Sequence, residues 1–155
     1  MKNVEELINQ IDDFNQLIAH VNSFLEPAQF PIKFEGYSDT LYDFYQLQDY
    51  DFLSIFEVSK ACLFWSNYFS EHVSILIFMK EHHLLNHDWM RAKEDLNNPS
   101  RFYEQACLDE FNKVALIEKL IDRIYAHVEA FDQASDHCIR LYNRALEALD
   151  HYPNY

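Results

Sequence analysis

Apolar residues recur at helical spacing through the first 25 residues of the chain. One set recurs every seven residues, namely Val4, Ile11, Ile18 and Leu25. A second set lies between its members, namely Leu7, Phe14 and Val21. This heptad spacing places their side chains on one face of an α-helix. Ile8, Leu17 and Phe24 widen that face, which is typical of a helix that packs against two neighbours in a bundle. We therefore predict one helix up to residue 25, ended by Pro27 and Pro31.

Two longer patterns occupy the middle and the end of the chain. Apolar residues keep a helical spacing from Asp51 to His87 without an internal Pro or Gly, which predicts a long helix. A second heptad register begins at Val114 and continues to residue 149. It predicts a single helix from Arg101 to about Asp150, with a break near residue 133 as the alternative.

Shorter helices are predicted between these long ones. Residues 26–38 contain two prolines and the one glycine and are expected to be irregular. Ser38 and Asp39 are both good N-cap residues, so a new helix is expected to begin at one of them. Another short helix is expected from Asn86 or Asp88 to about residue 96, before the turn at residues 97–100.

The composition leaves few alternatives to a helical fold. The chain has 155 residues, of which 49% are hydrophobic, and a single glycine, Gly36. Sheets joined by tight turns and phosphate-binding loops need more glycines, because glycine adopts positive φ without steric cost. The length suits one domain. We predict an all-α, single-domain bundle over residues 1–155, with about four main helices, of which the first, the middle and the last are long.

The net charge excludes some classes of partner. The chain carries 26 acidic side chains against 12 Lys plus Arg, which gives a formal net charge of −14 at pH 7. Nucleic acid and anionic lipid are repelled by such a surface over a Debye length of about 8–10 Å. We therefore expect a basic protein as the partner, with no direct contact to nucleic acid or to a membrane.

The cysteines and the N-terminal residues predict a cytoplasmic protein. Cys62, Cys107 and Cys138 are odd in number, widely spaced and never in a CxxC pair, which indicates reduced, buried packing residues. The N-terminal sequence MKNVEELINQ carries acids where a signal peptide carries basic residues followed by an apolar run. The longest uncharged stretches fall well short of the ~20 residues of a membrane span.

The candidate binding segment comprises residues 34–59. This segment contains no Lys or Arg. It is rich in both carboxylates and aromatic rings. Tyrosine offers a large rigid face and a hydroxyl, while carboxylates attract Lys and Arg of a partner. The predicted partner-binding residues are Glu35, Tyr37, Asp39, Tyr42, Asp43, Tyr45, Asp49, Tyr50 and Asp51. The alternative interpretation is an ordinary core beside an ordinary solvated acidic face.

This segment is consistent with two kinds of inhibitor. In the first, the protein resembles an immunity protein or antitoxin that docks on a basic nuclease or other toxin and blocks its active site. In the second, the carboxylates imitate phosphates, as in anti-restriction and anti-CRISPR proteins. Asp39 and Asp43, one helical turn apart, would lie about 5–6 Å from each other. Any acidic helix offers that spacing. Docking on a nuclease or toxin requires fewer surface residues in defined positions than phosphate mimicry does, so we rank the first version higher.

A metal-binding bundle is the alternative function. His83 and His87 stand at HxxxH spacing, which places both imidazoles on one helix face, and His127 is the candidate third ligand. This pattern is similar to the three-histidine bundles of the DinB-like family, although there the HxxxH motif lies near the C-terminus and here it is central. The other interpretation is that His83 and His87 hydrogen-bond the last carbonyls of a helix.

The sequence predicts no catalytic residue and no cofactor. It contains no GxSxG motif, no Cys–His pair at a predicted helix start and no glycine-built oxyanion loop. We therefore expect a binding protein without catalysis of its own. The heptads of residues 4–25 and 114–149 fit pairing within one chain or across a homodimer equally well.

Overall fold

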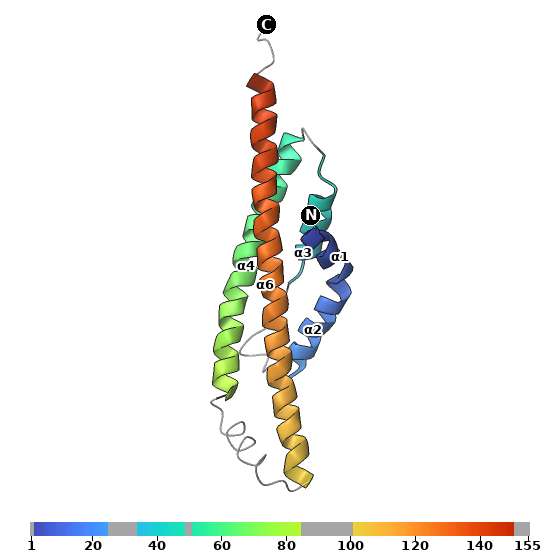
Figure 1. Cartoon of the computed structure of the whole chain (residues 1–155), viewed down its shortest axis with the longest axis vertical. Coiled ribbons are helices and arrows are strands. Elements are labelled where there is room, and N and C mark those ends of the chain that lie inside the picture. Colours follow the sequence, from blue (N-terminus) through green and yellow to red (C-terminus); the bar gives the residue numbers. More distant parts are fainter. Residues whose placement is uncertain (1, 25–33, 49–50, 85–100, 151–155) are drawn as a thin grey trace. The chain divides into compact units, whose positions relative to one another are not determined.

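The structure is a computed structural model that describes residues 2–24, 34–48, 51–84 and 101–150. Its regular elements in these ranges are all α-helices (Figure 1). They are α1 (Lys2–Asn9), α2 (Ile11–Phe24), α3 (Tyr37–Tyr45), α4 (Phe52–Leu84) and α6 (Arg101–Asp150). The prediction of an all-α bundle is confirmed. Among the described helices, none combines the length and the apolar character needed to cross a membrane.

The predicted first helix is in fact two helices, α1 and α2, which meet at Gln10. The Gln10 amide donates to the carbonyl oxygens of both Glu6 and Leu7, at 3.1 and 3.0 Å, so the chain tightens into a turn there. No Pro or Gly marks this position, and the heptad spacing continues through it. A single unbroken helix was therefore the wrong prediction, although Val4, Leu7, Phe14 and other members of the heptads are buried as expected.

The short helix α3 begins at Tyr37, one residue before the predicted caps. Gly36 occupies the N-cap position in the left-handed region, with φ of 92°. This conformation is strained for residues with a side chain, which explains why the one glycine of the chain lies here. Ser38 and Asp39 consequently belong to the first turn of the helix and do not cap it.

The two long helices follow the sequence prediction closely. Helix α4 begins after Asp51 and continues to Leu84, and α6 is one helix of 50 residues with no break near residue 133. The irregular stretch at residues 26–33, the short helix predicted up to residue 96 and the turn at residues 97–100 lie outside the described residues. Helices α4 and α6 both contribute residues to each of the two compact units into which the contacts divide the chain. No observation tests whether residues 1–155 form a single domain, so that prediction stays open.

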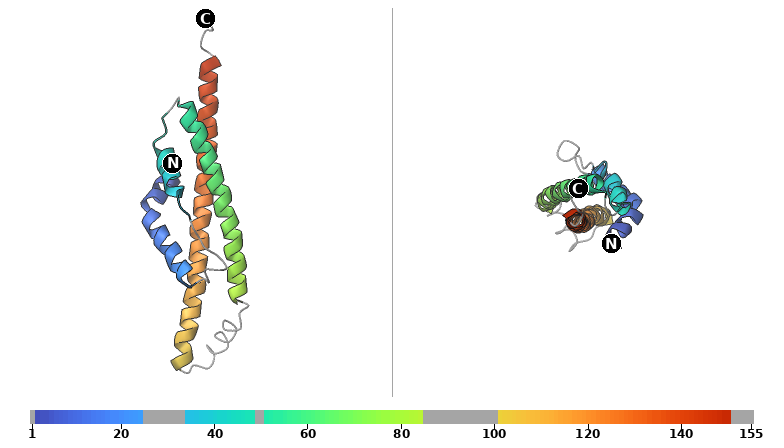
Figure 2. Two further views of the ribbon diagram at one scale, coloured as in Figure 1. Left: turned by 180° about the vertical axis from the view of Figure 1, so that it is seen from behind. Right: turned by 90° about the horizontal axis from the view of Figure 1, so that it is seen from above.

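The first unit comprises residues 1–12, 33–70 and 126–155. Within it, the first half of α4 and the last half of α6 run antiparallel, because Phe52 contacts Tyr142 and Phe69 stacks on Phe131. Helix α3 packs against α1, and the two views of Figure 2 agree on their neighbouring positions. Tyr37 and Phe44 of α3 also contact rings of α4 and α6, so α3 has one buried face, and its opposite face is exposed.

An aromatic cluster around Phe69 forms the core of the first unit. The Phe69 ring lies 4.5 Å from Phe34, 5.8 Å from Tyr37, 5.2 Å from His127 and 5.7 Å from Phe131, measured between ring centroids. Phe69, Tyr37 and Phe131 are each at most 1% exposed. Since these rings come from the approach to α3 and from α3, α4 and α6, the cluster joins the helices of the unit.

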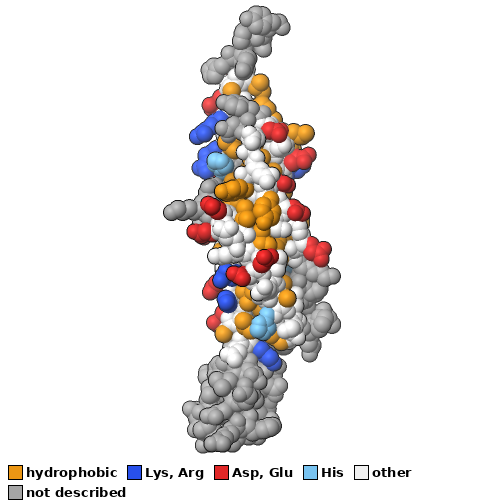
Figure 3. All heavy atoms as spheres, turned by 90° about the vertical axis from the view of Figure 1, so that its right-hand side faces the viewer, with side chains coloured by type: hydrophobic (Ala, Val, Ile, Leu, Met, Phe, Trp, Pro, Cys, Tyr) orange, Lys and Arg blue, Asp and Glu red, His pale blue; other side chains and the backbone are white. Residues whose placement is uncertain are grey.

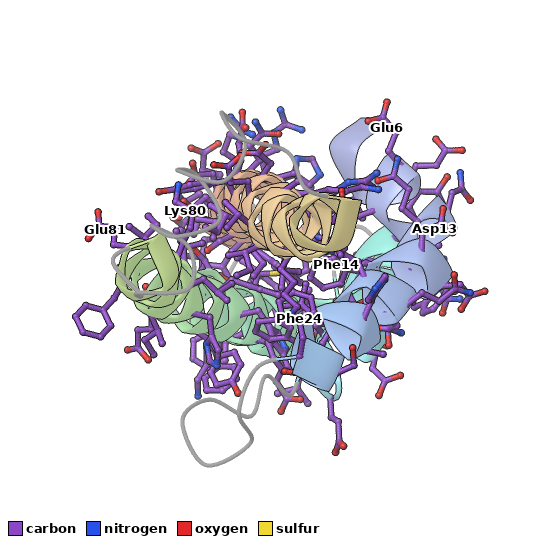
Figure 4. The ribbon with its side chains drawn as sticks, turned by 90° about the horizontal axis from the view of Figure 1, so that it is seen from below. Glu6, Asp13, Phe14, Phe24, Lys80 and Glu81 are labelled. Atoms are coloured by element: carbon purple, nitrogen blue, oxygen red, sulfur yellow. The ribbon has the colours of Figure 1, made fainter. Side chains whose placement is uncertain are left out.

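The second unit comprises residues 13–32 and 71–125. Apolar side chains on each of its helical segments are buried, namely Phe14, Ile18 and Val21 on α2, Val73 and Leu76 on α4, and Val114, Ile117, Leu120, Ile121 and Ile124 on α6. Lys80 of α4 pairs with Glu118 of α6 at 3.6 Å. Figure 4 shows Phe14 pointing from α2 into the packed interior and Asp13 pointing away from it. Each helical segment of this unit is thus amphipathic and buries its apolar face.

Removal of the Phe69 ring is expected to destabilise the fold strongly. Phe69→Ala leaves a cavity among four rings, so the free energy of unfolding should fall by about 3–5 kcal/mol, measured by urea denaturation. Tyr125→Ala is the control, because Tyr125 is exposed on α6 and should change stability by no more than about 0.5 kcal/mol. Similar losses in both variants would contradict the central role of the cluster.

Candidate partner-binding site

Helix α3 presents an acidic and aromatic face to solvent. Its buried face consists of Tyr37, Thr40, Leu41 and Phe44. Asp39 and Asp43 lie one turn apart on the opposite face, and both are exposed. Tyr42 and Tyr45 are 46% and 55% exposed. The structure therefore brings together four of the predicted partner-binding residues on one helix.

A hollow of about 410 Å³ lies between the end of α3 and the beginning of α4. The residues that line it are Thr40, Asp43, Gln46, Leu47, Gln48, Asp51, Ser54, Glu57, Val58 and Ala61. We call it the acidic hollow, because Asp43, Asp51 and Glu57 contribute carboxylates while no Lys or Arg is among the described residues that line it. Its size lies in the range of pockets that hold small groups. The chemistry of its walls suits an ammonium or guanidinium group.

The wall of the hollow on α3 is held in place by a hydrogen bond to α4. The indole Nε1–H of Trp65 donates to the hydroxyl of Thr40, at 3.1 Å. Thr40 is 7% exposed, so this bond is largely protected from water. Trp65 also contacts the rings of Tyr37 and Phe69 edge-on or tilted, at 6.4 and 5.9 Å between centroids. The orientation of α3, and with it that of Asp43, thus depends on the aromatic cluster.

Asp51 has a structural role besides lining the hollow. It caps the N-terminus of α4: the backbone N–H of Ser54 donates to Asp51 Oδ1 at 3.2 Å, and the Ser54 hydroxyl donates to Oδ2 at 2.8 Å. These two hydrogen bonds hold the pKa of Asp51 below its ordinary value, and the bond from the Ser54 hydroxyl has the larger effect. The carboxylate is therefore ionised and oriented at the rim of the hollow.

Tyr37 does not belong to the exposed surface. Its side chain is 1% exposed, and its ring contacts Trp65, Phe69 and His127. Burial raises the pKa of its hydroxyl far above the ordinary value, and the charge of Asp12 and the neighbouring Tyr42 raise it further. We therefore correct its assignment as a binding residue. Helical spacing could have indicated this, because Tyr37, Thr40, Leu41 and Phe44 share one face.

The other predicted binding residues are placed as follows. Glu35 is exposed beside Gly36, before the start of α3. Asp49 and Tyr50 lie outside the described residues. Glu57 was missed as a site residue by the sequence reasoning, although it belongs to the same acidic segment. The spacing from Asp51 through Ser54 to Glu57 and Val58 places these residues on one side of α4. This spacing could have identified Glu57 from the sequence.

The described cysteines are buried thiols, as the sequence predicted. Cys62 on α4 and Cys138 on α6 are free and fully buried. Burial raises the pKa of Cys62 to about 12, with a further increase from the neighbouring Cys138, and burial raises the pKa of Cys138 to about 11. Both are therefore protonated near neutral pH and unreactive as nucleophiles. Cys107 lies on α6, and its side chain is not described.

The metal-binding alternative rests on residues that the structure describes only in part. His127 is 2% exposed and its ring contacts Tyr37 and Phe69. Phe69 precedes His83 by about four turns of α4, so these contacts favour a core role for His127. His87 and the side chain of His83 lie outside the described residues. Within the described part of the chain, no group of three or more His, Cys, Asp or Glu side chains could hold a metal ion.

The absence of positive charge at the hollow is a local property. The molecular face drawn in Figure 3 carries Lys and Arg as well as Asp and Glu. Lys80 pairs with Glu118, and another hollow, of about 270 Å³, is lined by Lys119 and Arg123 together with Asp13. Mixed charge is the usual arrangement on protein surfaces. The one-signed walls of the acidic hollow therefore distinguish it.

Comparisons with known proteins give no further assignment. No family model matches the chain, and neither a curated protein nor a solved structure matches it.

The cap at Asp51 predicts a specific dependence of stability on pH. Folding lowers the pKa of Asp51 from its ordinary 3.8, so its ionised form stabilises the fold above that pH, and the contribution disappears as the pH falls through the lowered value. Asp51→Ala should therefore lower the melting temperature at neutral pH, and the difference from wild type should shrink in strong acid.

Circular dichroism melts at a series of pH values measure this difference. Asp51→Asn is the matched control, because asparagine retains an acceptor oxygen and is itself a good N-cap, so it should lose less than alanine. A melting-temperature difference between wild type and Asp51→Ala that does not change with pH would contradict the role of the ionised carboxylate.

Proposed function

We propose that the protein is a non-catalytic binding protein that inhibits or neutralises a basic protein partner through the face formed by α3 and the acidic hollow. The observation that carries this proposal is the hollow itself, with the carboxylates of Asp43, Asp51 and Glu57 and no Lys or Arg among its described lining residues. A Lys or Arg side chain of the partner, inserted there, would form charge-assisted hydrogen bonds to these carboxylates.

The exposed tyrosines beside the hollow support the same proposal. Tyr42 lies one turn from both Asp39 and Tyr45 on α3. A tyrosine buried in an interface removes a large apolar area from water and orders few rotatable bonds, which makes it a frequent anchor of tight complexes. Carboxylates around such anchors increase the association rate with a basic partner and disfavour acidic ones.

Of the two inhibitor versions, the geometry favours direct docking on a nuclease or toxin. Phosphate mimicry needs several carboxylates that follow one another at the spacing of phosphates along a strand. Asp39 and Asp43 provide only one such pair on α3, whereas Asp51 and Glu57 line a concave site together with Asp43. A concave acidic site fits a projecting basic side chain. The immunity- or antitoxin-like inhibitor is therefore the version we propose, and the nucleic-acid mimic is second.

The proposal is tested by measuring how tightly the partner binds a variant in which two carboxylates of the hollow are replaced by lysine. The tagged protein is used to capture partners from a native lysate, and a captured basic protein is then purified and titrated. Asp43→Lys with Glu57→Lys should weaken its affinity about a hundredfold, because two carboxylates facing its cation are replaced by repelling charges. The wild-type protein should also inhibit the activity of the captured protein.

Glu5→Lys with Glu147→Lys is the matched control, since both residues are exposed outside the hollow and the change in net charge is the same. This variant should bind nearly as tightly as wild type. Equal losses in both variants would mean that net charge alone attracts the partner. Competition between added nucleic acid and this protein for the target would favour mimicry, and a captured protein whose activity is unaffected would contradict inhibition.

A further inference from the structure

A hollow with basic walls lies between α2 and α6, within the second unit, and has a volume of about 270 Å³. Its α6 wall carries Lys119 and Arg123, one helical turn apart. Its α2 wall carries Gln16 and His20, also one turn apart. We call it the basic hollow. All four side chains donate hydrogen bonds through N–H groups, and Lys119 and Arg123 add two positive charges, so these are groups that bind an anion.

The inner wall of the basic hollow is apolar. It is formed by Phe14 and Leu17 of α2 and Leu116 of α6. Phe14 is buried, and Figure 4 shows its side chain pointing into the interior, whereas Leu17 and Leu116 are only half-buried. An apolar wall with a few converging polar groups is typical of sites for small organic molecules, whose usual volume is about 300–1,000 Å³. The basic hollow lies just below this range and therefore suits a small ligand.

The basic hollow keeps a positive charge although one carboxylate lines it. Asp13 is exposed on the α2 side and offsets one of the two positive charges of Lys119 and Arg123. Arg123 is half-buried and already interacts within the chain. A guanidinium carries five N–H donors, more than a single partner uses. Both cationic groups thus have donors to offer to a ligand.

The acidity of the whole chain does not exclude an anion at this place. Among the side chains that the structure describes, carboxylates far outnumber Lys and Arg in the first unit, whereas the two kinds are nearly balanced in the second. Salt largely screens exposed charges that lie more than about 8–10 Å away. The charges that line the basic hollow therefore decide which ligand it attracts.

We propose that the basic hollow binds a small organic phosphate monoester, with the phosphate at Lys119 and Arg123 and the organic part against Leu17 and Leu116. A guanidinium donates two parallel hydrogen bonds to a phosphate, and an ammonium adds a further charged donor. A carboxylate has fewer oxygens and a single negative charge, so it would use fewer of these donors. Because the basic hollow belongs to the second unit and shares no residue with the acidic hollow, this inference is independent of the proposed function.

The experiment is isothermal titration calorimetry of the full chain with phenyl phosphate, at low salt and neutral pH. One phenyl phosphate should bind per chain. Benzoate should bind at least about tenfold more weakly because of its single charge. Inorganic phosphate, which has no ring to contact Leu17 and Leu116, should bind at least about threefold more weakly. The absence of saturable binding, or an equal affinity for benzoate or for inorganic phosphate, would overturn the phosphate monoester.

A pair of substitutions places the ligand in the basic hollow. Lys119→Gln with Arg123→Gln should weaken the binding of phenyl phosphate at least about tenfold. Arg140→Gln with Arg144→Gln is the matched control, because these arginines are exposed on α6 at the same spacing but outside the hollow. This control should bind like wild type. Equal losses in both pairs would mean that any two cations on α6 suffice, and would overturn the site.

Two single substitutions separate binding from folding. Lys119→Gln alone changes an exposed side chain, so the helical circular dichroism signal should stay the same while binding weakens about threefold. Asp13→Asn removes the carboxylate that repels the phosphate and should strengthen binding about threefold, an effect that damage to the fold would not produce. Unchanged or weaker binding by Asp13→Asn would place the phosphate away from this hollow and overturn the proposal.

Discussion

The burial of Phe69 among rings from several parts of the chain is the interaction on which the first unit depends. Phe69 is fully buried and contacts Phe34, Tyr37, His127 and Phe131, which come from two segments distant from Phe69 in the sequence. A nine-residue helix such as α3 is too short to be stable in water by itself. Its position therefore follows from the apolar surface that Tyr37 and its neighbours bury against α4 and α6, with the Trp65–Thr40 hydrogen bond fixing its orientation.

The candidate site is a consequence of this core. With one face of α3 buried, Asp39, Tyr42 and Asp43 face solvent, and the chain turns back to start α4 at the Asp51 cap. The hollow forms where these two helices diverge, and the carboxylates of Asp43, Asp51 and Glu57 line it together. The same arrangement that stabilises the fold thus concentrates negative charge on one surface. The inhibition of a basic protein that we propose makes use of this negative surface.

Helix α4 connects the core of the first unit with the candidate site. Its inner side supplies Ile55, Cys62 and Phe69 to the core, and one flank supplies Ser54, Glu57 and Val58 to the hollow. A helix that contributes to a core and also to the wall of a hollow is constrained on more than one side. The apolar pattern of α4 is correspondingly less one-sided than that of α2.

The sequence alone determined the helical class, the extent of α4 and α6 to within about three residues, and the acidic, tyrosine-rich character of residues 34–59. These properties follow from local periodicity, from the scarcity of glycine and from composition. Only the tertiary structure decided that the first heptads divide at Gln10, that Tyr37 is buried, and that Asp43, Asp51 and Glu57 line one hollow. The physical reason is that the spacing of residues along a helix fixes which side chains share a face, whereas the burial of that face depends on contacts with segments distant in the sequence.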